Sequence, residues 1–117
     1  MSAKVARGLN KVMIIGTVGR RPEMRFTPSG IPVTNFSVGV QRQWTTSHGE
    51  AREATEWFNV VAWSDLAEQS NQQLQSEALV YVEGSLQTRS WEDNEGNRHH
   101  GTELVAERVT LLSEMPA

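Results

Sequence analysis

The feature that most constrains the fold is a set of extended segments whose residues alternate between two faces. In Thr55–Trp63, TEWFNVVAW, every second residue of a strand points to the same side. Phe58 and Val60 then face a core. Trp57 and Trp63, two of the four tryptophans in the chain, face the opposite side. Such alternation predicts a strand with one buried face, in which the largest side chains lie on the other face.

The remaining segments complete a small all-β pattern. We expect a polar loop over Thr45–Ala54, a hairpin turn over Asp93–Asn97 and a bend or bulge at Gly84. Ser64–Leu74 is the single helical candidate, with Ser64 as its cap. The expected strands are Asn10–Gly19, Val33–Trp44, Thr55–Trp63, Ala78–Trp91 and Thr102–Leu112, with a short segment, Glu23–Phe26, bracketed by turns. Five strands with one short helix between the third and fourth predict the OB-fold, a five-stranded Greek-key barrel.

Composition excludes several classes of protein. At 117 residues the chain suits one domain, which we place at residues 1–112, with 113–117 as a short C-terminal end. The absence of cysteine excludes disulfides and thiol chemistry. No apolar run reaches the roughly 20 residues of a membrane helix, and the N-terminus lacks the apolar centre of a signal peptide. We therefore expect a cytoplasmic protein with no membrane association.

The net charge of −3 is unevenly distributed. Residues 1–49 contain seven Lys or Arg and one acidic residue, whereas residues 50–117 contain four basic and thirteen acidic residues. Charge divided in this way is compatible with a polyanionic partner for one surface, and equally with an unevenly charged solvated surface.

The tryptophans give the sharper indication. Trp91 has the parity of Tyr81 and Arg89 and so lies opposite the apolar face of its strand. Trp44 shares the parity of the core residues, so a bend or bulge is needed to turn it outward. Exposed aromatic area invites association, and indoles stack on the unpaired bases of a single-stranded nucleic acid at roughly 1–3 kcal/mol per base. Arg42 and Arg89 each precede a tryptophan by two positions and can share its face.

The chain resembles the bacterial single-stranded DNA-binding proteins. The resemblance rests on RGLNKVMIIGTVGRRPEMRFTPSG, TEWFNVVAW, LAE and VYVEGSLQTRSW, which follow in order over almost the whole chain. It implies sequence-independent binding and protection of single-stranded DNA in replication, recombination and repair, without cofactors, by a homotetramer built as a dimer of dimers. It also implies base stacking by Trp44, Trp57, Trp63 and Trp91, and phosphate contacts by Arg7, Lys11, Arg25 and Arg89, to which Arg42 is added as a weaker candidate.

Two departures from that family pattern stand out. Ser64-Asp65, Ser76-Glu77 and Ser90 occupy positions that are often basic, so we expect fewer phosphate contacts and a shallower salt dependence of binding. The flexible linker and acidic tip of cellular members are missing, whether absent or removed. Replication and repair proteins are expected as partners only if the full-length protein has such a tail. Nucleoid association follows from the resemblance as well.

Rival functions have less support. His99-His100 and Glu103 could indicate a metal or acid–base site, but adjacent strand residues point to opposite faces. We therefore expect no enzyme activity and no metal, with both histidines solvated in a hairpin. A module that binds a protein partner through the same surface stays open. Binding of oligosaccharide or structured RNA explains the number and spread of the tryptophans less well.

Overall fold

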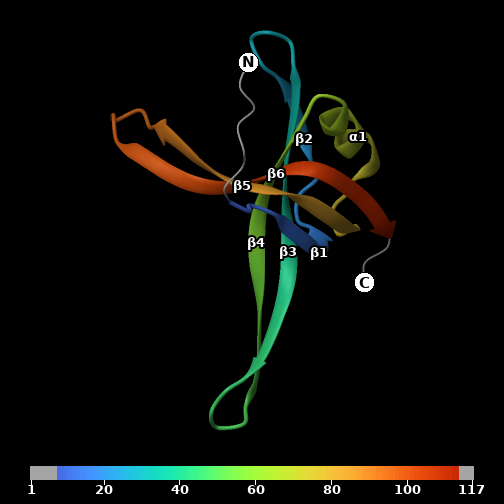
Figure 1. Ribbon diagram of the computed structural model, residues 1–117, viewed down its shortest axis with the longest axis vertical. Helices are drawn as coiled ribbons and strands as arrows, with labels where there is room; N and C mark the ends of the chain where they lie inside the picture. Colours follow the sequence, from blue (N-terminus) through green and yellow to red (C-terminus); the bar gives the residue numbers. More distant parts are fainter. Residues whose placement is uncertain (1–7, 114–117) are drawn as a thin grey trace.

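The computed structural model describes residues 8–113, and these form six strands and one helix (Figure 1). Arg7, one of the predicted phosphate contacts, lies outside the described residues, as do 114–117 of the predicted C-terminal end. The elements are β1 (Val12–Val18), β2 (Glu23–Phe26), β3 (Pro32–Thr45), β4 (Ala51–Trp63), α1 (Asp65–Gln73), β5 (Leu79–Glu92) and β6 (Arg98–Ser113).

Five of the strands close into a barrel. The sheet order is β1-β5-β6-β4-β3-β2, and the sheet closes where β1 also pairs with β3 through Thr17–Gly39 and Val18–Val38. The short β2 extends the sheet beyond β3, and the β4–β6 pairing is parallel. Because α1 lies between the third and fourth barrel strands, the predicted all-β OB-fold is confirmed.

The barrel interior is the hydrophobic core. It is built mainly of β-branched and aliphatic residues from every barrel strand, which suits a pleated surface that is covered on one side. Helix α1 packs on it through the buried Ala67, Ser70 and Leu74, the last of which follows the helix directly. The fully buried Thr34 hydroxyl donates a 2.7 Å hydrogen bond to the Ala67 carbonyl and so ties the helix to β3.

The start of α1 differs from expectation. Ser64 makes no side-chain capping hydrogen bond, and its φ of 58° lies in the left-handed region. Its carbonyl instead accepts the Ala67 and Glu68 amides, and its own amide donates to the Pro32 carbonyl. Ser64 therefore turns the chain from β4 into the helix through its backbone.

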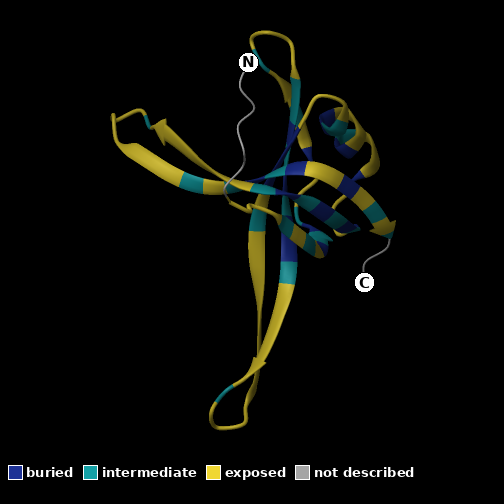
Figure 2. Cartoon of the chain, viewed as in Figure 1, coloured by how far each residue is buried: buried dark blue, intermediate teal, exposed yellow. Residues whose placement is uncertain are grey.

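Two hairpins extend from the barrel as arms (Figures 1 and 2). The β3–β4 ladder is unbroken from Val33–Trp63 to Thr45–Ala51. The predicted loop Thr45–Ala54 is therefore too long: β3 includes Thr45, β4 begins at Ala51, and the turn spans residues 46–50. Residues 41–45 of β3 and 51–57 of β4 are exposed on both faces. A strand solvated on both faces needs no apolar alternation, which is why the polar sequence indicated a loop.

The β5–β6 arm is also longer than expected. Strand β6 begins at Arg98 instead of Thr102, and its ladder with β5 continues out to Glu92–Arg98. The bulge expected at Gly84 is confirmed, because the register shifts between Glu83 and Gly84. There β5 and β6 approach each other so closely that a Cβ on Gly84 would lie 2.0 Å from the Val105 carbonyl oxygen.

Candidate nucleic-acid interface

Strand pairing gathers the predicted site residues on one side of the sheet, which we call the outer face. Trp57, Asn59, Val61 and Trp63 mark it on β4, opposite the core residues Val60 and Ala62. Residues paired across a ladder share a face. The outer face therefore continues through Val33, Asn35, Ser37 and Gly39 on β3, Glu23 and Arg25 on β2, Val105, Glu103, Gly101 and His99 on β6, and Ser85, Gln87, Arg89 and Trp91 on β5.

All four indoles are exposed, at 40% for Trp44, 58% for Trp57, 45% for Trp63 and 44% for Trp91. A buried tryptophan would be accounted for by packing alone, whereas these leave large apolar areas in contact with solvent. Three of the four, at 57, 63 and 91, lie on the outer face.

Trp44 reaches solvent by a different route from the one expected. No bulge interrupts β3 between Val38 and Trp44, so the indole keeps the parity of the core face. It is exposed because the β3–β4 arm has left the barrel and there is no core beneath it. Trp44 therefore lies on the other side of this ribbon from Trp57. The Arg42 guanidinium lies over its ring at 4.6 Å from the centroid.

The indole of Trp57 packs against two glycines, Gly39 and Gly19, which we call its seat. A Cβ built on Gly39 would lie 2.9 Å from Cζ3 of the indole, and one built on Gly19 would lie 2.8 Å from the same atom. Both distances are shorter than real Cβ atoms tolerate. The ring therefore occupies space that only glycine leaves free, and it lies against the backbones of β3 and of the chain leaving β1.

Trp91 is held by a second arrangement at the β5–β6 arm. Its ring stacks on His99 with centroids 5.6 Å apart and an interplanar angle of 23°. His99 in turn donates a hydrogen bond of 2.8 Å to Asp93 at the turn. This hydrogen bond, together with backbone amides including that of Asn97, lowers the pKa of Asp93 below its ordinary value. The Arg89 guanidinium lies 5.6 Å from the Trp91 centroid. The sequence predicts a solvated His99, and this residue is indeed exposed. It also stacks on Trp91, and together with Asp93 and Arg89 it forms what we call the Trp91 setting.

The predicted cations fall into two groups. Arg25 and Arg89 lie on the outer face, and no ion pair within the described residues involves either. Arg42 is paired with Glu56 at 3.0 Å, on the same side of the arm as Trp44. Lys11 is paired with Glu83 at 3.4 Å. Glu83 precedes Arg89 by six residues on β5, about 20 Å along the strand, so Lys11 lies away from the arm that carries Trp91.

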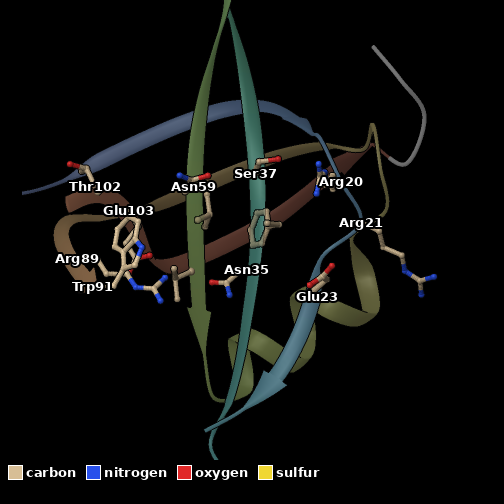
Figure 3. Close-up of a pocket in the computed structure, with 14 residues that line it drawn as sticks. Arg20, Arg21, Glu23, Asn35, Ser37, Asn59, Arg89, Trp91, Thr102 and Glu103 are labelled. Carbon is tan, nitrogen blue, oxygen red and sulfur yellow. The ribbon is translucent and has the colours of Figure 1, made fainter. Parts of the chain in front are cut away.

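A polar groove crosses the outer face (Figure 3). Its volume is about 440 Å³. Sequence reasoning missed most of its lining: the amides of Asn35 and Asn59 and the Ser37 hydroxyl form the floor, and Arg20 and Arg21 lie at one end. The signal available was the Arg20-Arg21 pair itself, which follows the first strand directly.

Comparison with known proteins identifies the family. The model of the Single-strand binding protein family matches residues 9–112. The chain belongs to this family. Over 109 residues it is 46% identical to single-stranded DNA-binding protein 1 of Chlorobaculum tepidum, covering 92% of this chain and 67% of that one.

Solved structures agree with this placement in the single-strand binding family. A Plasmodium falciparum SSB complex with ssDNA superposes with a TM-score of 0.86 at 28% identity, over 94% of this chain and all of that one. A deletion mutant of the single-stranded DNA binding protein from Thermus aquaticus gives 0.82 at 33% identity, over 93% of this chain and 53% of that one. The chain thus spans about half of the Thermus protein chain.

Family membership bears on the rival functions as well. The family consists of DNA-binding proteins that are not enzymes, in agreement with the prediction that this chain is not an enzyme. Within residues 8–113, no three His, Asp or Glu side chains gather as a metal site. No helix in the same range is long and apolar enough to span a membrane.

Proposed function

We propose that this protein binds and protects single-stranded DNA without sequence preference, in replication, recombination and repair. The observation that carries the proposal is the outer face, a continuous surface with three exposed indoles and with Arg25 and Arg89, which form no ion pair in the part of the chain that the structure describes. Duplex DNA hides the faces of its bases, so such a surface distinguishes strands by accessibility. Relatives in the same family are named for this activity.

The binding mechanism combines stacking and charge neutralisation. Trp57, Trp63 and Trp91 stack on bases from the outer face, and Trp44 extends the contact along the β3–β4 arm. Each base contributes roughly 1–3 kcal/mol by stacking. Arg25 and Arg89 neutralise phosphates, with counterion release that makes affinity salt-dependent. Arg42 and Lys11 take part only by exchanging their carboxylate partners for phosphate, which exposed ion pairs allow because they are weak.

Mutation of the indoles tests this mechanism. Trp57→Ala is expected to weaken binding of oligo-dT by about 1–3 kcal/mol while the melting temperature stays close to that of the wild type, because the ring is 58% exposed. Leu9→Ala, which shortens an apolar side chain that is 91% exposed and lies before the barrel, is the control. A large fall in melting temperature for Trp57→Ala would instead assign the ring to an interface or to packing.

We also propose that the protein assembles as a homotetramer, a dimer of dimers, located at the nucleoid. The support is on β1, where Met13 and Ile15 are 62% and 55% exposed and β3 pairs only with Thr17 and Val18. An apolar strand with an unpaired edge is a template for another chain. Light scattering should give four times the monomer mass for the wild type and a smaller species for Ile15→Glu. A monomeric wild type would contradict the assembly.

Replication and repair proteins join as partners only through a C-terminal acidic tail, where the full-length protein has one.

A further inference from the structure

The groove across the outer face has two ends that differ in origin. At one end are Arg89 and Trp91, from the β5–β6 arm. At the other are Arg20 and Arg21, from the connection between β1 and β2 (Figure 3). Between them lie β6, β4 and β3, so at about 5 Å between neighbouring strands the crossing spans roughly 20 Å. The connection is fixed against the floor because the Gly19 amide donates a 2.9 Å hydrogen bond to the Ser37 carbonyl.

Arg20 and Arg21 are uncommitted charges. Both are exposed, and no ion pair in the described range involves either of them. The arginines of the β3–β4 arm differ, since Arg42 and Arg52 are held by Glu56 and Glu50. A guanidinium without a carboxylate partner keeps its donors available for the bidentate contact that a phosphate offers.

The groove floor suits the other part of a nucleotide. Ser37 and Asn59 face each other directly across the β3–β4 ladder, and Asn35 lies two residues along β3. These side chains are neutral and offer both donors and acceptors to base edges. Two carboxylates also line the groove, Glu23 beside Asn35 and Glu103 on β6. They repel phosphate from those positions and leave the arginines at the two ends as the favourable places for it.

We infer that Arg20 and Arg21 bind the phosphates of a single strand that crosses β4 and β3 between Trp57 and Trp63 and leaves the barrel over the β1–β2 connection. The inference rests on the proposed function. It adds a second pair of positive charges to the site, at the end of the groove opposite Arg89. It also changes the expectation from sequence, in which serines and acidic residues at 64–65, 76–77 and 90 reduce the phosphate contacts. Arg20 and Arg21 supply two contacts at the end of the groove, where the β1–β2 connection borders it.

The test is the salt dependence of oligo-dT binding to Arg20→Ala/Arg21→Ala, followed by tryptophan fluorescence over a series of salt concentrations. Each phosphate contact on a single strand contributes about 0.7 to the slope of log affinity against log salt. The double variant should therefore lose about 1.4 units of slope. Between roughly 50 and 200 mM salt, the factor by which the affinity of the double variant decreases should be about seven times smaller than the factor for the wild type. The quenching at saturation should be unchanged, because the indoles remain.

Two further variants make the result specific. Arg20→Lys/Arg21→Lys keeps both charges and should retain most of the slope. Arg108→Ala removes an arginine on β6 that lies opposite Glu83 and does not line the groove, and it should leave the slope at the wild-type value. An unchanged slope in the double alanine variant, or an equal loss in Arg108→Ala, would overturn the inference. A wild-type protein that does not bind oligo-dT would instead overturn the proposed function.

Discussion

Gly39→Ala tests whether the seat of Trp57 matters for binding. The new Cβ would lie 2.9 Å from Cζ3 of the indole and 2.9 Å from Cγ2 of Thr55, whereas ordinary contacts begin at 3.4 Å. The ring must therefore move by about 0.5 Å or tilt away from β3. Stacking of one base is worth roughly 1–3 kcal/mol. If the displaced ring loses about 1 kcal/mol of this, the Kd for oligo-dT rises about fivefold.

The same substitution has a small effect on folding. The φ angle of Gly39 is not in the left-handed region, so alanine fits the backbone. It also stiffens the unfolded chain, which is worth about 0.4–1 kcal/mol in favour of folding and offsets part of the steric strain. We expect a melting temperature close to the wild-type value together with weaker quenching by oligo-dT.

The control for Gly39→Ala is Gly8→Ala, at which a Cβ meets nothing within 4 Å. Trp57→Ala sets the largest loss of affinity that displacement of the ring can cause. Gly39→Ala with wild-type affinity, beside a clear loss in Trp57→Ala, would refute the role of the seat. Strong destabilisation by Gly39→Ala would show that the close contact supports the barrel instead.

Three other predictions concern the Trp91 setting, the surface cluster of Tyr81, Glu83 and Lys11, and the core. His99→Ala removes the ring stacked on Trp91 and should weaken oligo-dT binding about fivefold, and His99→Phe should restore most of it; equal affinities for all three proteins would contradict this. The Tyr81 hydroxyl, 2.6 Å from Glu83, and then Lys11 lower the pKa of Glu83. The resulting stability is present above the ordinary pKa of 4.5 and is lost as pH falls through the lowered value. Thermal melts should therefore show a smaller acid-side loss in Glu83→Gln, and identical pH profiles would exclude the cluster. Leu104→Ala, at a side chain 1% exposed, should cost about 2–5 kcal/mol in urea unfolding, and a loss below about 1 kcal/mol would place Leu104 outside the core.

The barrel is predictable from the sequence because its strands obey a simple rule. Val60 and Ala62 alternate with exposed or outer-face residues, and a period of two survives wherever one face is covered. The rule fails where neither face is covered. This is why the polar sequence of the outer part of the β3–β4 arm predicts a loop, and why parity predicts a bend or bulge before Trp44, although the β3–β4 ladder is unbroken there. The pairing of Thr17 with Gly39, which closes the barrel, depends on contacts far apart in the chain and has no local signal.

The types of side chain in the candidate site are predictable from the sequence, whereas the ion-pair partners of its cationic side chains are less so. Parity alone placed Trp57, Trp63 and Trp91 opposite the core, and their exposure agrees with that placement. Which cations are free depends on cross-strand neighbours that the sequence does not reveal. Thus Arg42 lies beside Glu56, whereas Arg20 and Arg21, in the connection between β1 and β2, line the groove and form no ion pair within residues 8–113.

The central claim is tested most directly by intrinsic tryptophan fluorescence during titration with oligo-dT, with a duplex of equal length as the control, at two salt concentrations. The account predicts strong quenching by the single strand alone, because exposed indoles stack only on unpaired bases. It also predicts weaker binding at the higher salt concentration. Absence of quenching at low salt, or equal quenching by the duplex, would contradict it.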